Sequence, residues 1–108
     1  MESVNVKLVV TVPETHADIV REVIGKAGGG KIGNYSFCSF SVKGIGRFRP
    51  EFGANPAIGN VGKMESVEEE RIEITCLRTL VPEIVREIKK VHPYEEVTID
   101  IYSIENPQ

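Results

Sequence analysis

IVREV at residues 19–23 and IVREI at residues 84–88 are nearly the same pentapeptide, and the second begins 84 − 19 = 65 positions after the first. Each copy lies in a segment whose apolar residues recur at helical spacing, over about 14–26 and about 80–91. At the same offset Val9 matches Ile74 and Val12 matches Leu77, in stretches that alternate between apolar and polar residues as strands do. The match predicts a duplicated strand–helix unit.

Two further stretches complete the pattern. Alternation and aromatic residues predict a second strand over about 35–42, besides strands at about 4–12, 67–77 and 97–102. Glycines at 28–30 end the first helix, and His92-Pro93 ends the second. Two βαβ halves of this length close most simply into an α+β, ferredoxin-like βαββαβ sandwich, an antiparallel sheet with both helices on one face. All 108 residues are expected to form this single domain.

A long glycine-rich loop, at about 44–63, is expected between the second and third strands. Its basic residues Lys43, Arg47, Arg49 and Lys63 stand out in a chain of net charge −3. That balance argues against nucleic acid as a partner and suits a small anionic ligand. The alternative is a solvated loop with scattered charge.

Hydropathy and the N-terminal sequence suggest where the protein works. No apolar run approaches the roughly 20 residues of a membrane helix, so no membrane association is expected. The first residues read as a strand rather than a secretory leader, and we expect a cytoplasmic protein. Cys38 and Cys76 fall in strand patterns and are expected to be buried structural thiols.

One face of the predicted sheet lacks a cover. Phe37 or Phe40, whichever points away from the helices, would be poorly placed in water. Packing of the open faces of several subunits is a natural remedy, so we expect a homo-oligomer, with a trimer favoured.

Several motifs, spread over residues 4–102, resemble the inserted domain of YqfO-type proteins. These are bacterial members of a family of conserved dinuclear-metal-centre proteins related to a yeast transcriptional co-activator-interacting factor. The motifs are GNYS at 33–36, GRFRP at 46–50, GANP at 53–56, IG at 58–59, VG at 61–62 and HPYEE at 92–96. The resemblance implies a stand-alone version of that domain.

Within that family the insert is similar to the nitrogen-regulatory PII proteins and to the trimeric CutA proteins, which also carry a His-Pro-Tyr-Glu run. The resemblance therefore implies a PII/CutA-like fold and a trimer. It does not transfer the family's di-metal site, whose ligands belong to a flanking domain; this chain has only His16 and His92 as histidines. Nucleotide binding rests on analogy with PII alone.

The Arg47-Phe48-Arg49 run is the first candidate site. Two guanidinium groups could hold an anion, with Phe48 as a stacking surface and the neighbouring glycines exposing backbone N–H groups. The alternative is that this loop only packs against a neighbouring subunit.

The second candidate is the cluster of His92, Tyr94 and Glu95 where the second helix ends. It could form a polar contact in a subunit cleft or provide a metal ligand, and the alternative is a helix stop. Cys38 and Met64, together with His92, would suit a copper ion in the Cu(I) state. A divalent ion or copper is therefore the cofactor to test.

We expect a non-enzymatic module, since no Ser-His-Asp order, activated cysteine or paired acid stands out. Its clefts would bind a small ligand or a protein partner, with a regulatory role; metal binding and a purely structural role are the alternatives. Because the loop and the segment after the second helix belong to opposite repeats, we expect them to meet only across a subunit boundary. The candidate ligand or subunit-cleft residues are Asn34, Tyr35, Arg47, Phe48, Arg49, Asn55, His92, Tyr94 and Glu95.

Overall fold

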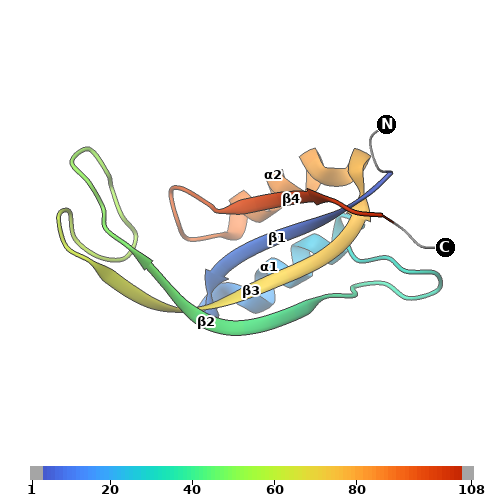
Figure 1. Ribbon diagram of the computed structural model, residues 1–108, viewed down its shortest axis with the longest axis horizontal. Coiled ribbons are helices and arrows are strands. Elements are labelled where there is room, and N and C mark those ends of the chain that lie inside the picture. Colours follow the sequence, from blue (N-terminus) through green and yellow to red (C-terminus); the bar gives the residue numbers. More distant parts are fainter. Residues whose placement is uncertain (1–3, 106–108) are drawn as a thin grey trace.

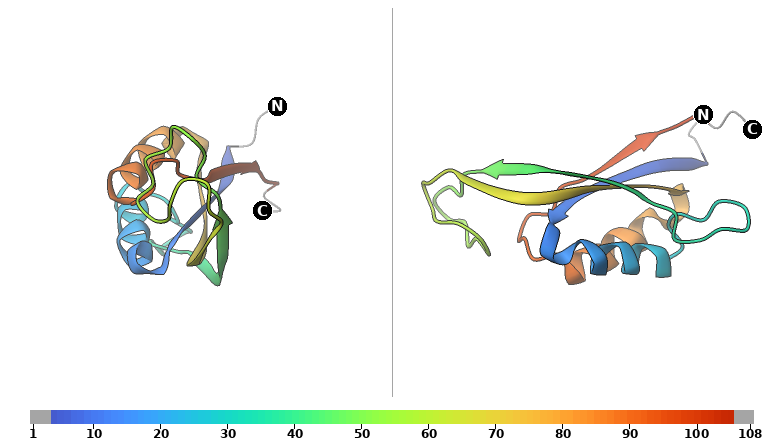
Figure 2. Two further views of the ribbon diagram at one scale, coloured as in Figure 1. Left: turned by 90° about the vertical axis from the view of Figure 1, so that its left-hand side faces the viewer. Right: turned by 90° about the horizontal axis from the view of Figure 1, so that it is seen from below.

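The computed structural model describes residues 4–105 as a four-stranded antiparallel sheet with two helices on one face (Figures 1 and 2). The order along the sheet is β2-β3-β1-β4. This arrangement is the predicted α+β, ferredoxin-like βαββαβ fold. Its elements are β1 (Asn5–Pro13), α1 (Ala17–Lys26), β2 (Phe40–Phe48), β3 (Glu65–Leu77), α2 (Val81–Val91) and β4 (Ile99–Ser103).

The core lies between the two central strands and the helices. Every second residue of β1 from Val6 to Val12, and of the second half of β3 from Ile72 to Cys76, points to the helices and is buried, as alternation along a strand requires. Each helix adds an apolar stripe that closes this layer. Cys76 is part of the core, and burial raises the pKa of its thiol. Cys38 is only partly buried and precedes β2, so the expectation of a second buried strand thiol was wrong; both cysteines are free. The fully buried larger side chains are Val6, Leu8, Val10, Val12, Val20, Ile24, Ile72, Ile84 and Ile88.

The two repeats are related by 64 positions rather than the 65 read from the pentapeptides. Short 3-10 turns at Glu14–His16 and Arg78–Leu80 lead into α1 and α2, which begin at Ala17 and Val81. The buried helix residue Val20 corresponds to Ile84, since 84 − 20 = 64. A shift of one residue turns a helix by about 100°. The identical letters of the two pentapeptides therefore face different directions.

The second strand and the loop differ from the sequence prediction. Phe37 has a φ of +60°, which ends any extended run before β2 begins at Phe40. Its ring lies against α1 at Gly25, where a Cβ would come within 1.9 Å of a ring carbon. β2 then continues through Gly44 to Phe48, so the connection to β3 spans 49–64 instead of about 44–63.

The β2–β3 hairpin extends beyond the rest of the sheet. β3 pairs with β1 only from Glu69 onward, so Glu65 to Glu68 pair with β2 alone. The overhang and its connecting loop project from the body, as the right-hand view in Figure 2 shows, and the longest dimension of the molecule is 48 Å. We call residues 49–64 the overhang loop.

The sheet face opposite the helices is uncovered. Register places Phe40 and Val42 of β2 on this face, and they are 65% and 45% exposed. Tyr102 of β4 lies on the same face and is 46% exposed. The chain alone therefore leaves apolar side chains exposed at both edges of this face, as the sequence predicted.

Candidate functional site

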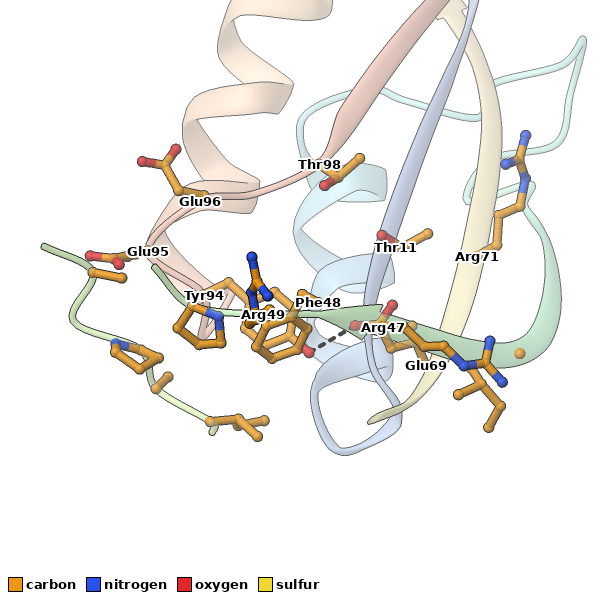
Figure 3. A pocket seen from close by; sticks show the side chains of 18 of the residues that line it. Thr11, Arg47, Phe48, Arg49, Glu69, Arg71, Tyr94, Glu95, Glu96 and Thr98 are labelled. Atoms are coloured by element: carbon orange, nitrogen blue, oxygen red, sulfur yellow. Dashed lines mark hydrogen bonds between the residues drawn. The ribbon is translucent and has the colours of Figure 1, made fainter. Parts of the chain in front are cut away.

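A cavity of about 750 Å³ lies where the overhang meets the segment that joins α2 to β4 (Figure 3). We call residues 92–98 the α2–β4 connector. The cavity is lined by β2 and the neighbouring Glu69 and Arg71 of β3, by part of the overhang loop and by the connector. Among the sequence candidates, Arg47, Phe48, Arg49, Tyr94 and Glu95 line it.

Tyr94 links the connector to β2 and to β3. Its ring meets Phe48 edge-on, with centroids 5.8 Å apart and planes at 61°. Its hydroxyl donates a 2.7 Å hydrogen bond to Oε2 of Glu69. Burial, followed by this bond and the Glu69 charge, raises the pKa of Tyr94 well above its ordinary value, so the hydroxyl stays a donor.

Glu69 occupies space that a glycine leaves open. A Cβ on Gly46 would lie 2.1 Å from Oε1 of Glu69 and 2.4 Å from its Cδ, so no larger residue fits there with this carboxylate position. The Glu69 side chain therefore packs against the backbone of β2 at Gly46, and Glu69 is only 8% exposed. Gly46 therefore shapes the site, within a strand rather than within a loop.

His92 fixes the start of the connector. The Tyr94 N–H donates to Nδ1 at 3.2 Å, so the ring is neutral with its proton on Nε2, which donates to the Thr11 carbonyl at 2.8 Å. His92 is 7% exposed, and burial lowers its pKa below the ordinary value. Both ring nitrogens are thus engaged, and a metal ion would have to displace one of these bonds.

A single hydrogen bond attaches the overhang loop to the connector. The backbone N–H of Asn55 donates to Oε1 of Glu95 at 2.9 Å. This bond joins the two segments within one chain, and the contact of Phe48, at the end of β2, with Tyr94 lies beside it. The expectation that they meet only across a subunit boundary was wrong, because it did not foresee how far the hairpin extends past the sheet.

Most basic side chains around the cavity already have acidic partners. Arg49 pairs with Glu51 at 2.6 Å, Arg71 with Glu73 at 3.1 Å and Lys43 with Glu14 at 3.6 Å. Arg47 has no acidic partner among residues 4–105. Figure 3 shows Arg49 turned toward Tyr94, whereas Arg47 extends along β2 away from it.

Other predicted site residues lie elsewhere. Asn34 and Tyr35 sit in an exposed turn closed by backbone bonds between Ile32 and Tyr35. Cys38 is held at the other end of the sheet, where its N–H bonds to Gly30 and Gly30 bonds to Thr75. The residues named for copper are therefore dispersed, and within 4–105 no three His, Cys, Asp or Glu residues cluster as metal ligands would.

Sequence reasoning missed Glu69, Thr11 and Thr98, which also line the cavity. Glu69 stood in the run 68–70, where alternation sends neighbouring acids to opposite faces. The sequence did contain one signal for Glu69, namely Gly46, which pairs next to this acidic run. A glycine within a strand often marks a place where another group comes close to the backbone. Register across β2 and β3 was needed to use it.

Comparisons with known proteins place the chain among bacterial relatives. No protein-family model matches it. It is 51% identical over 100 residues to a GTP cyclohydrolase 1 type 2 homolog from Halalkalibacterium halodurans, and 46% over 99 residues to the homolog from Bacillus subtilis. These matches cover 93% and 92% of the chain but 27% and 26% of the relatives. The chain therefore spans about a quarter of the length of the curated relatives it matches.

Solved structures agree at the level of fold. A Bacillus cereus protein related to NIF3 superposes with a TM-score of 0.84 at 42% identity, over 98% of this chain and 27% of that one. The periplasmic divalent cation tolerance protein CutA from Archaeoglobus fulgidus superposes with a TM-score of 0.70 at 18% identity, over 96% of this chain and 87% of that one. At that identity CutA shows the fold alone.

Neither helix of the described region has the length and apolar character needed to cross a membrane. The chain is therefore related in sequence to one segment, about a quarter of the length, of the NIF3-related, YqfO-type proteins called GTP cyclohydrolase 1 type 2 homologs. Its fold is the ferredoxin-like fold of CutA.

Proposed function

We propose that the chain is a non-enzymatic, homo-oligomeric module that binds a small ligand in the cavity between the overhang and the α2–β4 connector. The cavity itself carries the proposal. Its 750 Å³ falls in the range of small-molecule sites, and its walls combine aromatic and aliphatic side chains with a few charged groups. A regulatory role is expected if the ligand alters the overhang loop, which only the Asn55–Glu95 hydrogen bond ties to the connector.

Arg47 favours a ligand with an anionic group. It lines the cavity, and among the described residues it has no acidic partner, unlike Arg49, Arg71 and Lys43. A guanidinium offers two parallel donors to a carboxylate or phosphate. Arg49 could join it by exchanging Glu51 for the ligand.

The uncovered sheet face supports assembly. Phe40, Val42 and Tyr102 lie on it, and the cavity reaches the same face through Val42 and Thr98. A second subunit that covered this face would turn the cavity into an intersubunit cleft. We propose a trimer in the cytoplasm, the compartment in which two free cysteines are ordinarily kept reduced.

Thermal unfolding with a panel of nucleotides, small carboxylates, phosphate, divalent cations and Cu(I) tests this function, with molar mass recorded by light scattering. A ligand at 100 times its Kd should stabilise the protein by roughly 2.7 kcal/mol. Arg47→Gln should lose the response to anions, while Arg86→Gln, on the exposed side of α2, should keep it.

The same experiment separates the alternatives. A shift caused by copper and abolished by His92→Ala would indicate a CutA-like metal-binding protein. An oligomer that no compound stabilises would indicate a purely structural role. A monomer without any response would contradict the proposed function.

A further inference from the structure

The Glu69 carboxylate is buried without a positively charged partner. The residue is 8% exposed, and no Lys, Arg or His nitrogen of residues 4–105 lies within ion-pairing distance of it. The neighbouring acids differ: Glu70 pairs with Arg21 at 2.6 Å, and Glu73 pairs with Arg71. A buried charge is costly unless it is paired, so this carboxylate calls for an explanation.

Only one of its oxygens has a partner in the described part of the chain. Oε2 accepts the hydrogen bond from the Tyr94 hydroxyl, a neutral donor. Oε1 has no donor among the described residues. Every fully buried side-chain oxygen of these residues does have a hydrogen-bond partner, so Oε1 is not fully buried and contacts the cavity that Glu69 lines. Gly46 makes room for Oε1, because a Cβ at this position would stand 2.1 Å from it.

We infer that this cavity binds a protonated nitrogen, an ammonium or guanidinium group, at Oε1 of Glu69. The inference rests on the proposed function and deepens it, because it gives the ligand a cationic group besides any anionic group that Arg47 holds. The rings of Phe48 and Tyr94 stand beside the carboxylate and favour a cation in the same place.

Other acids around the cavity are less suited to this role. Glu51 is paired with Arg49, and Glu95 accepts the Asn55 N–H. Glu96 is exposed, so water already solvates it. Glu69 alone among these four combines burial, a neutral partner and an oxygen that faces the cavity.

The cation has two sources, a free small molecule or a Lys or Arg side chain of a second copy of this chain. The first gives a ligand effect, and the second gives an assembly effect. The test uses the full chain with 2-phenylethylamine and agmatine as probes, and 2-phenylethanol as the uncharged counterpart. Binding is measured by calorimetry, and molar mass by light scattering.

Glu69→Gln is the decisive variant, because glutamine keeps the shape and an acceptor for Tyr94 but removes the charge. Glu68→Gln is its control, since Glu68 is the exposed neighbour on β3. We expect the amines, but not the alcohol, to bind the wild type and Glu68→Gln, and Glu69→Gln to bind at least tenfold more weakly. If no amine binds but Glu69→Gln alone loses molar mass, the cation belongs to the second copy.

Amine binding that is equal in all three proteins, or no binding together with unchanged assembly, would overturn the inference. If Glu69→Gln fails to fold, judged by circular dichroism, Gly46→Ala replaces it, since the added methyl would displace the Glu69 carboxylate from its position while the charge remains. An anion response that depends on Arg47 would survive this failure, so the inference can fall while the proposed function stands.

Discussion

The two repeats have the same strand, turn and helix, but the connection that leaves the helix differs between them. After α1 the chain passes through three glycines, and the Gly30 N–H bonds to the Thr75 carbonyl of β3. After α2 the His92 side chain bonds to the Thr11 carbonyl of β1. The first connection is held by a backbone hydrogen bond and continues into an exposed turn. The second is held by a side-chain hydrogen bond and continues into a connector that lines the cavity.

The repeat therefore builds the fold, while the connections build the site. Strand and helix positions related by 64 residues bury equivalent side chains, for example Leu8 with Ile72 and Ile24 with Ile88. The cavity is formed instead by the overhang, the connector and the buried Glu69, none of which is duplicated. Three experiments test this contrast between the repeats, and we order them by expected effect.

The largest effect is expected from the isoleucines that begin the two pentapeptides. Ile84 is fully buried, so Ile84→Ala should lower the free energy of unfolding by about 2–5 kcal/mol through lost burial and a residual cavity. Ile19 is 39% exposed, and Ile19→Ala should cost less than half as much. Urea denaturation of both variants measures the difference; equal losses would contradict the expectation that burial decides the contribution of these two isoleucines to stability.

This register shows how far the sequence could lead. Periodicity is enough for fold class, because it reports which face of each element is apolar. Ile19 and Ile84 are the same residue type, but aligning them shifts the two helices by one residue. Equivalent helix positions are defined by burial, which aligns Val20 with Ile84. The buried set Val20 and Ile24, read by its spacing, was the sounder guide.

The site was only partly predictable, for reasons of register and chain path. The motifs around Arg47 and Tyr94 pointed to two of the walls, because glycine, proline and aromatic residues cluster there. Glu69 was invisible until β2 and β3 were paired, since its role depends on Gly46 across the strand. Cys38 illustrates the reverse error, as its chemistry suggested a metal while the topology places it away from His92.

The arginines of the two pentapeptides provide a second, intermediate effect. Arg21 joins α1 to Glu70 of β3 at 2.6 Å and to Ser41 of β2 at 3.1 Å, while within residues 4–105 Arg86 pairs only with Glu83 on its own helix. Arg21→Gln should lower the free energy of unfolding by about 1–3 kcal/mol, because it leaves a largely buried Glu70 carboxylate without its partner. Arg86→Gln should change it by less than about 0.5 kcal/mol, as for most exposed ion pairs.

Chemical denaturation at low and high salt measures these two arginine variants. A loss at Arg21 that salt does not reduce would agree with its partly buried position. Equal, small losses at both arginines would mean that α1 is held to the sheet by apolar packing alone, as α2 is.

The smallest effect is a pH dependence that only the second repeat should show. Burial lowers the pKa of His92 in the folded chain, against the opposing influence of the Thr11 carbonyl and the Glu69 charge. Above the ordinary histidine pKa of about 6.5 the His92 ring is neutral in both the folded and the unfolded chain, and its contribution to the free energy of unfolding is fully present. As the pH falls through that value, the unfolded chain takes up the proton first, so the free energy of unfolding decreases toward the lowered pKa.

Comparing wild type with His92→Gln between pH 7.5 and 5.5 isolates this term, because other groups titrate in both proteins. The stability difference between them should shrink as the pH falls. The ring must stay neutral to accept the Tyr94 N–H, so the same protonation should loosen the connector and weaken any ligand held by Tyr94 and Glu69. A wild-type slope identical to that of His92→Gln would mean that His92 is protonated as easily in the folded chain as in the unfolded one, and the side-chain contact that distinguishes the second connection would then have no energetic role.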